Sequence, residues 1–190
     1  MSMRIYHDLH TERLAVDALL NTVSPQRRQQ VMRHVRLSDR QSSLAAYLLL
    51  CRALRENYGI AEPPVFSFGP SGKPFLKDHP DIHFNLSHTE GIAVCVVADV
   101  PVGVDVERIR PIDRQVVDMV MSDDEQAEIS LAEDSDTAFY RLWTRKEAYL
   151  KLTGEGLRDD MRNVLADTEG CLFQSLPLTE KASCTVVTRE

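Results

Sequence analysis

Long apolar runs are missing from this 190-residue chain, and their absence limits the kind of protein it can be. Its longest apolar stretches, such as 92–98, fall well short of the ~20 residues that a membrane-spanning helix needs. The N-terminal sequence MSMRIYHDLHTERL also lacks the apolar segment of a secretory signal peptide. We therefore expect a soluble, cytoplasmic protein with no membrane partner.

Cysteine is scarce, and none of the four cysteines forms a C-x-x-C pair. Cys51 and Cys95 lie inside apolar runs, where a free thiol behaves as a small core residue. A zinc site needs clustered ligands, and a catalytic cysteine needs a partner base. The sequence offers neither arrangement, so we expect reduced cysteines without a catalytic role.

An excess of positive charge is also missing, because 29 acidic residues outnumber 22 basic ones and give a net charge of −7. This balance argues against broad nucleic-acid binding. The two signs are nevertheless segregated, with basic residues in 27–40, 52–55 and 141–151 and acidic residues in 99–136. Such segregation suits an anionic ligand and a cation, although charge counts alone favour two ordinary solvated surfaces.

The periodicity of the chain predicts helices around a cluster of strands. Helices are expected over 12–20, from Pro25 to 34 and over 39–57, then over 113–121, 123–131 and 136–152. Strands are expected over 3–8, 65–68, 82–85, 92–98, 102–109, 171–176 and 182–188. This pattern is typical of an α+β fold, and a weak boundary falls at 99–101.

The first motif that can carry chemistry is the strand-like sequence V-G-V-D-V-E. Because side chains alternate along a strand, Asp105 and Glu107 share one face, while Val104 and Val106 point into the core. Two carboxylates on one face form a plausible site for Mg²⁺, which fills its remaining positions with water and substrate phosphates. Taken alone, a solvated acidic face explains the motif better.

The second motif is the helical sequence W-T-R-K-E-A-Y-L-K, which begins at Trp143. Glu147 and Lys151 lie four residues apart and share a helix face. An ordinary surface ion pair explains this spacing, but Glu147 can also supply a third metal ligand. In that interpretation Lys146 and Lys151 approach a phosphate group.

The third motif combines G-K-P at 72–74 with F-N-L-S-H at 84–88. Lys73 follows a glycine-rich turn, a place where an ammonium group can meet an anion. Ser87 and His88 supply polar groups at the end of a strand. A single histidine is more often structural, so His88 carries little weight by itself.

Together, the three motifs resemble the Sfp-like 4′-phosphopantetheinyl transferase family. The strand G-V-D-V-E, a gap of some forty residues and the helix W-T-R-K-E-A-Y-L-K resemble the paired signature of that family. G-K-P and F-N-L-S-H-T resemble its additional motifs. The resemblance covers about Gly69 to Leu157.

The resemblance implies two similar α+β halves related by a pseudo-twofold axis, with the ligand cleft between them. We expect the halves to comprise 1–100 and 101–190, and a chain that holds both can act as a monomer. Members of the family transfer the phosphopantetheinyl arm of coenzyme A to a serine of an acyl or peptidyl carrier protein. Adenosine 3′,5′-bisphosphate is the second product.

By resemblance, Mg²⁺ is held by Asp105, Glu107 and Glu147. A carboxylate or a metal-bound water must take the serine proton, and our hypothesis is that Glu147 or a water that it holds does so. Contacts with coenzyme A then fall to a set of mostly basic residues: Lys73, Pro74, Ser87, His88, Lys146 and Lys151. Glu125 lies where relatives often carry an acid near the site. Carrier surfaces are often acidic, which suggests a basic docking patch that includes Arg141 or Arg145.

The sequence departs from the family where relatives place an arginine in the long first-half helix to hold the 3′-phosphate of coenzyme A. Arg40 and Arg52 are the candidates there, and Arg27 and Arg28 are a second pair. Two other functions use the same residues. One is a Mg²⁺-dependent hydrolase of a nucleotide pyrophosphate, and the other is a non-catalytic module that binds coenzyme A or a carrier.

Overall fold

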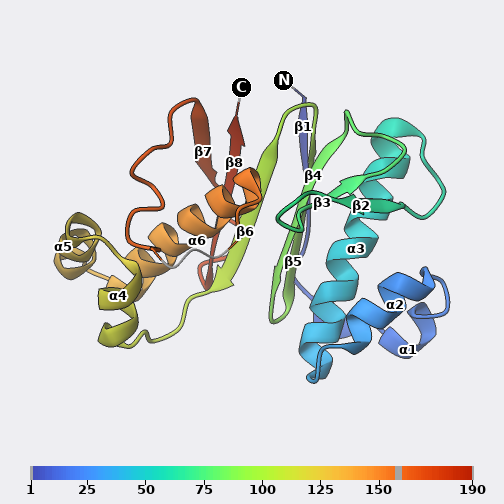
Figure 1. Ribbon diagram of the computed structural model, residues 1–190. Coiled ribbons are helices and arrows are strands. Elements are labelled where there is room, and N and C mark those ends of the chain that lie inside the picture. The colour runs from blue at the N-terminus through green and yellow to red at the C-terminus, as the bar shows by residue number, and fades with distance from the viewer. Residues whose placement is uncertain (1, 157–159, 190) are drawn as a thin grey trace.

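The computed structural model describes residues 2–156 and 160–189 and has an α+β fold in two halves (Figure 1). Leu157, at the end of the stretch that resembles the transferases, lies outside the described residues. The first half contains β1 (Met3–Asp8), the 3-10 turn η1 (Thr11–Arg13), α1 (Val16–Leu19), α2 (Pro25–Met32), α3 (Leu37–Tyr58), β2 (Phe66–Phe68), β3 (Pro74–Leu76), β4 (His83–Thr89) and β5 (Ile92–Ala98). The second half contains β6 (Val102–Arg108), α4 (Arg114–Val120), α5 (Asp123–Leu131), α6 (Ser135–Thr153), β7 (Cys171–Ser175) and β8 (Ala182–Arg189).

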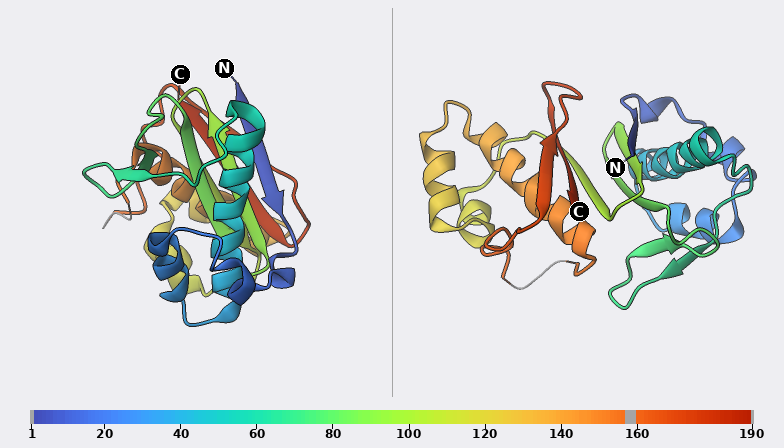
Figure 2. Two further views of the ribbon diagram at one scale, coloured as in Figure 1. Left: turned by 90° about the vertical axis from the view of Figure 1, so that its right-hand side faces the viewer. Right: turned by 90° about the horizontal axis from the view of Figure 1, so that it is seen from above.

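Each half is built from a three-stranded antiparallel sheet with one long helix packed on it. The first sheet has the order β1-β5-β4 and carries α3, and the second has the order β6-β8-β7 and carries α6. The sheets lie side by side in the centre of the molecule, with α3 and α6 toward opposite outer sides (Figures 1 and 2). The expected two-half α+β fold is therefore confirmed.

Strand β5 shows how the alternation of side chains builds these layers. Val94 and Val96 pack with Val104 and Val106 of β6 in the core between the two halves. The residues between them face the opposite way and pack against α3, as Cys95 does. Because both faces of β5 are covered, the strand reads as a continuous apolar run.

Helix boundaries follow the expected capping chemistry. The Ser24 side chain accepts a hydrogen bond from the Arg27 amide, and Pro25 opens α2. Gly59 and Gly154 end α3 and α6 in the left-handed region, with φ values of 69° and 76°. The predictions for these three helices are confirmed within one or two residues at the capped ends.

The expected helix over 12–20 is wrong, because η1 and the short α1 replace it. Thr11 does not cap a helix here, since its hydroxyl is buried and bonds Ser42 at 2.9 Å. Gln41 donates from Nε2 to the carbonyl oxygens of Glu12 and Leu14, at 2.8 and 3.1 Å. These bonds from α3 occupy acceptors that a continuous helix would use.

Two strands differ from the prediction in the region of the third motif. β3 was not predicted, and it forms a short hairpin with β2. β4 extends to Thr89 because it pairs with β5 along its full length, up to the turn at Gly91, where φ is 76°. Ser87 and His88 therefore lie within a strand, whereas the predicted strand ends at 85.

Gly103 allows α6 to lie directly on β6. A Cβ atom at this position would overlap the carbonyl oxygen of Ala148 and lie 2.6 Å from the amide nitrogen of Leu152. Both obstacles are backbone atoms of a regular helix, which cannot move aside individually. The glycine therefore sets the distance between the strand that carries Asp105 and the helix that carries Glu147.

We predict that Gly103→Ala destabilises the protein by about 3 kcal/mol, because overpacking forces the helix away from the strand. In a chain of this size that loss lowers the unfolding midpoint by roughly 6–12 °C, which thermal denaturation measures. Gly69→Ala is the matched control, because its Cβ would meet only the Lys73 carbonyl oxygen at 3.7 Å. Equal midpoints for the two variants would contradict the close approach.

No helix within residues 2–156 and 160–189 combines the length and the apolar character needed to cross a membrane.

Candidate active site

Asp105 is the centre of a polar cluster between the two halves. It lies on β6 and is only 3% exposed, so it is not part of a solvated acidic face. Its Oδ1 accepts a hydrogen bond from the Ser87 hydroxyl at 2.9 Å and pairs with the Lys151 ammonium at 2.6 Å. Oδ2 is buried and has no hydrogen-bond partner among the described residues.

Glu147 and Lys151 approach this cluster from α6, on the shared face that the spacing predicts. The Lys151 ammonium donates to the Ser87 hydroxyl at 3.0 Å as well as to Asp105. Glu147 Oε1 is buried without a hydrogen-bond partner in the described parts of the chain. Two acidic side chains therefore each leave one buried oxygen unpaired, which is unusual in a folded protein.

The pKa values indicate that the three carboxyl groups influence one another. Burial, followed by the charge of Asp105, raises the pKa of Glu107 to about 7. Burial and Asp105 also raise the pKa of Glu147. Lys151 opposes both shifts without cancelling them. Burial and the neighbouring carboxyl groups thus disfavour the ionised forms of Glu107 and Glu147, and a bound cation would favour them.

The cluster suits a hard cation in its chemistry, but it is not arranged as a complete metal site. In the described residues, no three His, Cys, Asp or Glu side chains are grouped closely enough to hold a metal ion. At Asp105, the Lys151 ammonium occupies the Oδ1 side of the carboxylate. The unpaired oxygens of Asp105 and Glu147 are the atoms that remain free to bind a cation.

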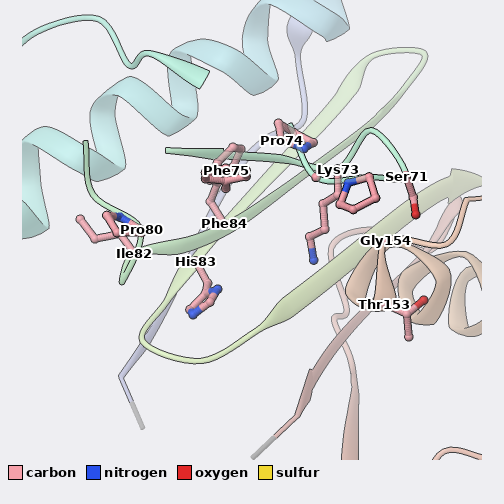
Figure 3. A pocket seen from close by; sticks show the side chains of 12 residues that line it. Ser71, Lys73, Pro74, Phe75, Pro80, Ile82, His83, Phe84, Thr153 and Gly154 are labelled. Atoms are coloured by element: carbon pink, nitrogen blue, oxygen red, sulfur yellow. The ribbon is translucent and has the colours of Figure 1, made fainter. Parts of the chain in front are cut away.

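Two adjoining cavities open beside the cluster. One, of about 330 Å³, is lined by Glu147 and Lys151 of α6, Asn85 of β4 and the loop at 71–74. The other, of about 420 Å³, continues along β4 past Phe84 toward His83 and Pro80 (Figure 3). The two share Ser71, Lys73, Pro74 and Gly154 in their linings, so a long ligand can extend from one into the other.

Lys73 lies on the wall between these cavities, and its side chain reaches from the loop before β3 toward the end of α6 (Figure 3). Its ammonium donates to the carbonyl oxygens of Leu152 and Val102, at 2.8 and 3.2 Å. Burial lowers the pKa of Lys73 to about 8. Gly154 accommodates the stem, since a Cβ there would lie 3.2 Å from Lys73 Cβ. The ammonium therefore binds backbone carbonyls of the second half.

His88 lines a third, polar cavity of about 430 Å³, together with Glu107 and Tyr140. Its ring meets that of His34 edge to face, with 5.8 Å between centroids. Burial, followed by the neighbouring His34 and Lys151, lowers the pKa of His88 to about 4. The imidazole is therefore neutral near pH 7 and can both donate and accept a hydrogen bond.

The expectation that Lys146 approaches a phosphate is wrong in this structure. Lys146 is 0% exposed, and its ammonium pairs with Glu125 at 2.7 Å. It also donates to three carbonyl oxygens, those of Val120, Met161 and Arg162. This lysine fastens α6 to the N-terminal turn of α5, where Glu125 completes a capping box with Ser122.

The two arginines expected from α3 differ in position. Arg52 points away from the cluster: it pairs with Glu56 at 2.7 Å and lies over the Tyr6 ring of β1, across the sheet from β4. Arg40 lies closer to His88, because its Nε donates to the carbonyl oxygen of His34 at 2.7 Å and the His34 ring contacts that of His88.

Arg27, from the second pair of candidates, is the basic residue that lines a cavity near His34. The cavity measures about 270 Å³ and has aromatic walls that include Tyr47 and Phe66. The guanidinium lies 5.1 Å from the centre of the Tyr47 ring and donates to Ser43 Oγ at 2.9 Å. Its Nε is buried without a partner among the described residues. An incompletely paired guanidinium in a cavity is a candidate anion site.

Comparison with known proteins identifies the family of the chain. Residues 101–185 match the family model described as the 4′-phosphopantetheinyl transferase superfamily, and residues 11–100 match the model of the N-terminal part of a 4′-phosphopantetheinyl transferase. The chain is 33% identical to the 4′-phosphopantetheinyl transferase psf-1 of Bacillus pumilus over 93% of its own length and 77% of the relative. It is 30% identical to Sfp of Bacillus subtilis over 80% of its length and 70% of the relative. AcpT of Salmonella typhimurium is 39% identical over 60% of this chain and 59% of its own.

The chain belongs to the 4′-phosphopantetheinyl transferase superfamily. It is an enzyme of the Sfp type, which transfers the 4′-phosphopantetheine group from coenzyme A to carrier proteins. Enzymes of this family generally use Mg²⁺. The resemblance found in the sequence is thus confirmed for family, fold and reaction.

Proposed function

We propose that the transfer takes place at the cluster of Asp105, Glu107, Glu147 and Lys151, with Mg²⁺ held by the three carboxylates. The observation that carries this assignment is the pair of buried, unpaired oxygens on Asp105 and Glu147, which two different elements contribute. Glu147 and Lys151, the ion-pair partner of Asp105, line one cavity. Oxygen ligands are the type that Mg²⁺ prefers. When bound, the metal supplies positive charge to the pyrophosphate of coenzyme A.

Coenzyme A would lie along β4, with its pyrophosphate near Lys151 and His88. Lys151 and His88 line separate cavities, but they lie close enough for the lysine charge to act on the histidine, and both have nitrogen donors that can face phosphate oxygens. Arg27 is our assignment for the 3′-phosphate, supported by its buried and unpaired Nε, and Arg40 is a neighbouring candidate. Pro74 and the stem of Lys73 would provide an apolar wall for coenzyme A where the two cavities along β4 adjoin.

In the transfer itself, the serine hydroxyl of the carrier attacks the phosphorus atom that bears pantetheine. A new oxygen–phosphorus bond forms, and the bond to the bridging oxygen breaks with release of adenosine 3′,5′-bisphosphate. We assign acceptance of the serine proton to Glu147 or a water that it holds, since Glu147 lines the cavity beside Lys151. Lys151 adds fixed positive charge where the leaving phosphate becomes more negative.

The boundary between the halves falls, in our proposal, at 99–101, which gives 1–100 and 101–190 with both sides of the cleft in one chain. A monomer can then form the complete site. We further propose a cytoplasmic location, supported by four cysteines that are all free thiols.

A carrier-loading assay tests this function and separates it from hydrolysis of coenzyme A. The protein is incubated with coenzyme A, Mg²⁺ and apo acyl or peptidyl carriers, and intact masses are recorded with and without a chelator. We expect a carrier to gain one phosphopantetheine group in step with release of adenosine 3′,5′-bisphosphate, and the chelator to stop both. Cleavage of coenzyme A without a mass gain would instead identify a hydrolase.

The raised pKa of Glu107 predicts how the stability of the metal-free protein depends on pH. In the folded protein the Glu107 carboxyl group keeps its proton up to about pH 7, whereas in the unfolded chain it loses the proton near its ordinary pKa of 4.5. Below 4.5 this difference has no effect, so the free energy of unfolding falls as the pH rises from about 4.5 through 7. Urea denaturation at several pH values measures the fall. Glu107→Gln is expected to remove this part of it, and an unchanged pH profile would contradict the assignment.

A further inference from the structure

One edge of β6 has no strand beside it, although it lies in the interior. β6 is the outer strand of its sheet. The backbone groups of its odd-numbered residues point toward β8, since the Pro101 carbonyl oxygen accepts from the Arg189 amide and the Ile109 amide donates to the Lys181 carbonyl oxygen. Backbone groups alternate in direction along an antiparallel strand, so those of Val102, Val104 and Val106 face the first half. All three valines are 0% exposed, and such groups need partners where water is excluded.

Side chains of the first half provide a partner for one backbone group of each valine. The Val104 amide donates to Asn85 Oδ1 at 2.8 Å, and the Val106 amide donates to Ser87 Oγ at 3.2 Å. The Val102 carbonyl oxygen accepts from the Lys73 ammonium at 3.2 Å. Asn85 is 8% and Ser87 4% exposed, so the bonds to the Val104 and Val106 amides are well shielded from water.

The spacing of the partners matches the repeat of a strand. Asn85 and Ser87 are two residues apart on β4, and they bind amides that are two residues apart on β6. Both point to the same side of β4, because they pair with Val96 and Val94 of β5, which face the second half. β4 and β6 thus run in the same direction with one layer of side chains between their backbones.

We propose that Lys73, Asn85 and Ser87 form a side-chain ladder along the open edge of β6, which sets the spacing and register of the two halves. Direct pairing would bring β4 and β6 to ~4.8 Å, whereas an interposed side chain keeps them further apart. The ladder therefore joins the halves while leaving room for the cavity that Asn85 and Lys73 line. Its three members are positioning residues.

Ser87 connects the ladder to the proposed site, and this part of the inference rests on the proposed function. Its hydroxyl accepts from the Val106 amide and from Lys151, and it donates to Asp105. One donor and two acceptors complete the bonding of a hydroxyl group. A shift of β6 along β4 would therefore separate Ser87 from both Asp105 and Lys151.

A direct test needs no substitution. A scalar coupling across the hydrogen bond between the Val104 amide nitrogen and the Asn85 side-chain carbonyl carbon is measured by NMR on the wild-type protein without ligands. We expect this coupling to be present. Its absence, in a spectrum that shows the couplings between β6 and β8, overturns the ladder.

Amide exchange provides the second test. In Asn85→Ala the Val104 amide should exchange about tenfold faster, and in Asn85→Asp, which keeps the acceptor oxygen, it should stay protected. Ser42→Ala is the matched control, because it removes a buried hydroxyl from the Thr11 pair within the first half. We expect Ser42→Ala to leave both Val104 exchange and the Mg²⁺ dependence of transfer unchanged. Asn85→Ala should raise the Mg²⁺ concentration that transfer requires, and Asn85→Asp should return that concentration to the wild-type value.

The tests separate the ladder from the assignment of the active site. Unchanged Val104 exchange in a folded Asn85→Ala protein overturns the ladder, whatever the transfer activity. A normal ladder together with Asp105 variants that transfer at the wild-type rate refutes the proposed site and leaves the ladder standing.

Discussion

Glu147→Gln should lower the rate of carrier loading by about 10³-fold. The substitution keeps the size of the side chain but removes its charge and its basicity. Metal binding and proton acceptance each contribute on the order of 10²-fold or more to reactions of this kind, and they act here through one carboxylate. Initial rates at several Mg²⁺ concentrations, with the carrier followed by intact mass, measure the effect.

Glu133→Gln is the control for this prediction, since Glu133 is an exposed acid of the same half. It should load the carrier at the wild-type rate. If Glu147→Gln retains full turnover with unchanged metal affinity, Glu147 is neither a metal ligand nor the base.

Lys146→Met should destabilise the enzyme by about 3 kcal/mol, the cost of breaking a buried ion pair by removing one partner. The variant leaves Glu125 without its cation and removes the donor from three carbonyl oxygens. We expect the unfolding midpoint to fall by roughly 6–12 °C. Differential scanning calorimetry measures the fall.

The affinity for coenzyme A distinguishes this structural role from a contact with phosphate. Isothermal titration well below the unfolding midpoint should give the wild-type affinity for Lys146→Met. Glu125→Gln in the same background should restore part of the lost stability, because it removes the uncompensated charge. A large loss of affinity with no change in midpoint would return Lys146 to the phosphate site.

Local sequence patterns were sufficient to predict most elements and the shared faces within them. Alternation on β6 places Asp105 and Glu107 on one face, and the four-residue spacing on α6 does the same for Glu147 and Lys151. The helix over 12–20 failed because its competitors are donors from α3, far along the chain. Such long-range bonds leave no local signal.

The errors within the site have a similar cause. Lys146 and Lys151 are five residues apart, so they point in directions that differ by about 140° around the helix and cannot both face one phosphate. This could have been inferred from the spacing. The pairing of Lys151 with Asp105, the position of Arg52 over β1 and the partners of β6 depend on how the halves pack, and motif order does not reveal that.

Binding of Mn²⁺, a paramagnetic substitute for Mg²⁺, tests the central claim that three carboxylates from β6 and α6 hold the metal together. Free Mn²⁺ is measured by electron paramagnetic resonance in titrations with coenzyme A present. We predict one tight site in the wild type and in Glu133→Gln, and its loss in Asp105→Asn, Glu107→Gln and Glu147→Gln alike. Equal Mn²⁺ affinity in all five proteins would contradict the proposed site.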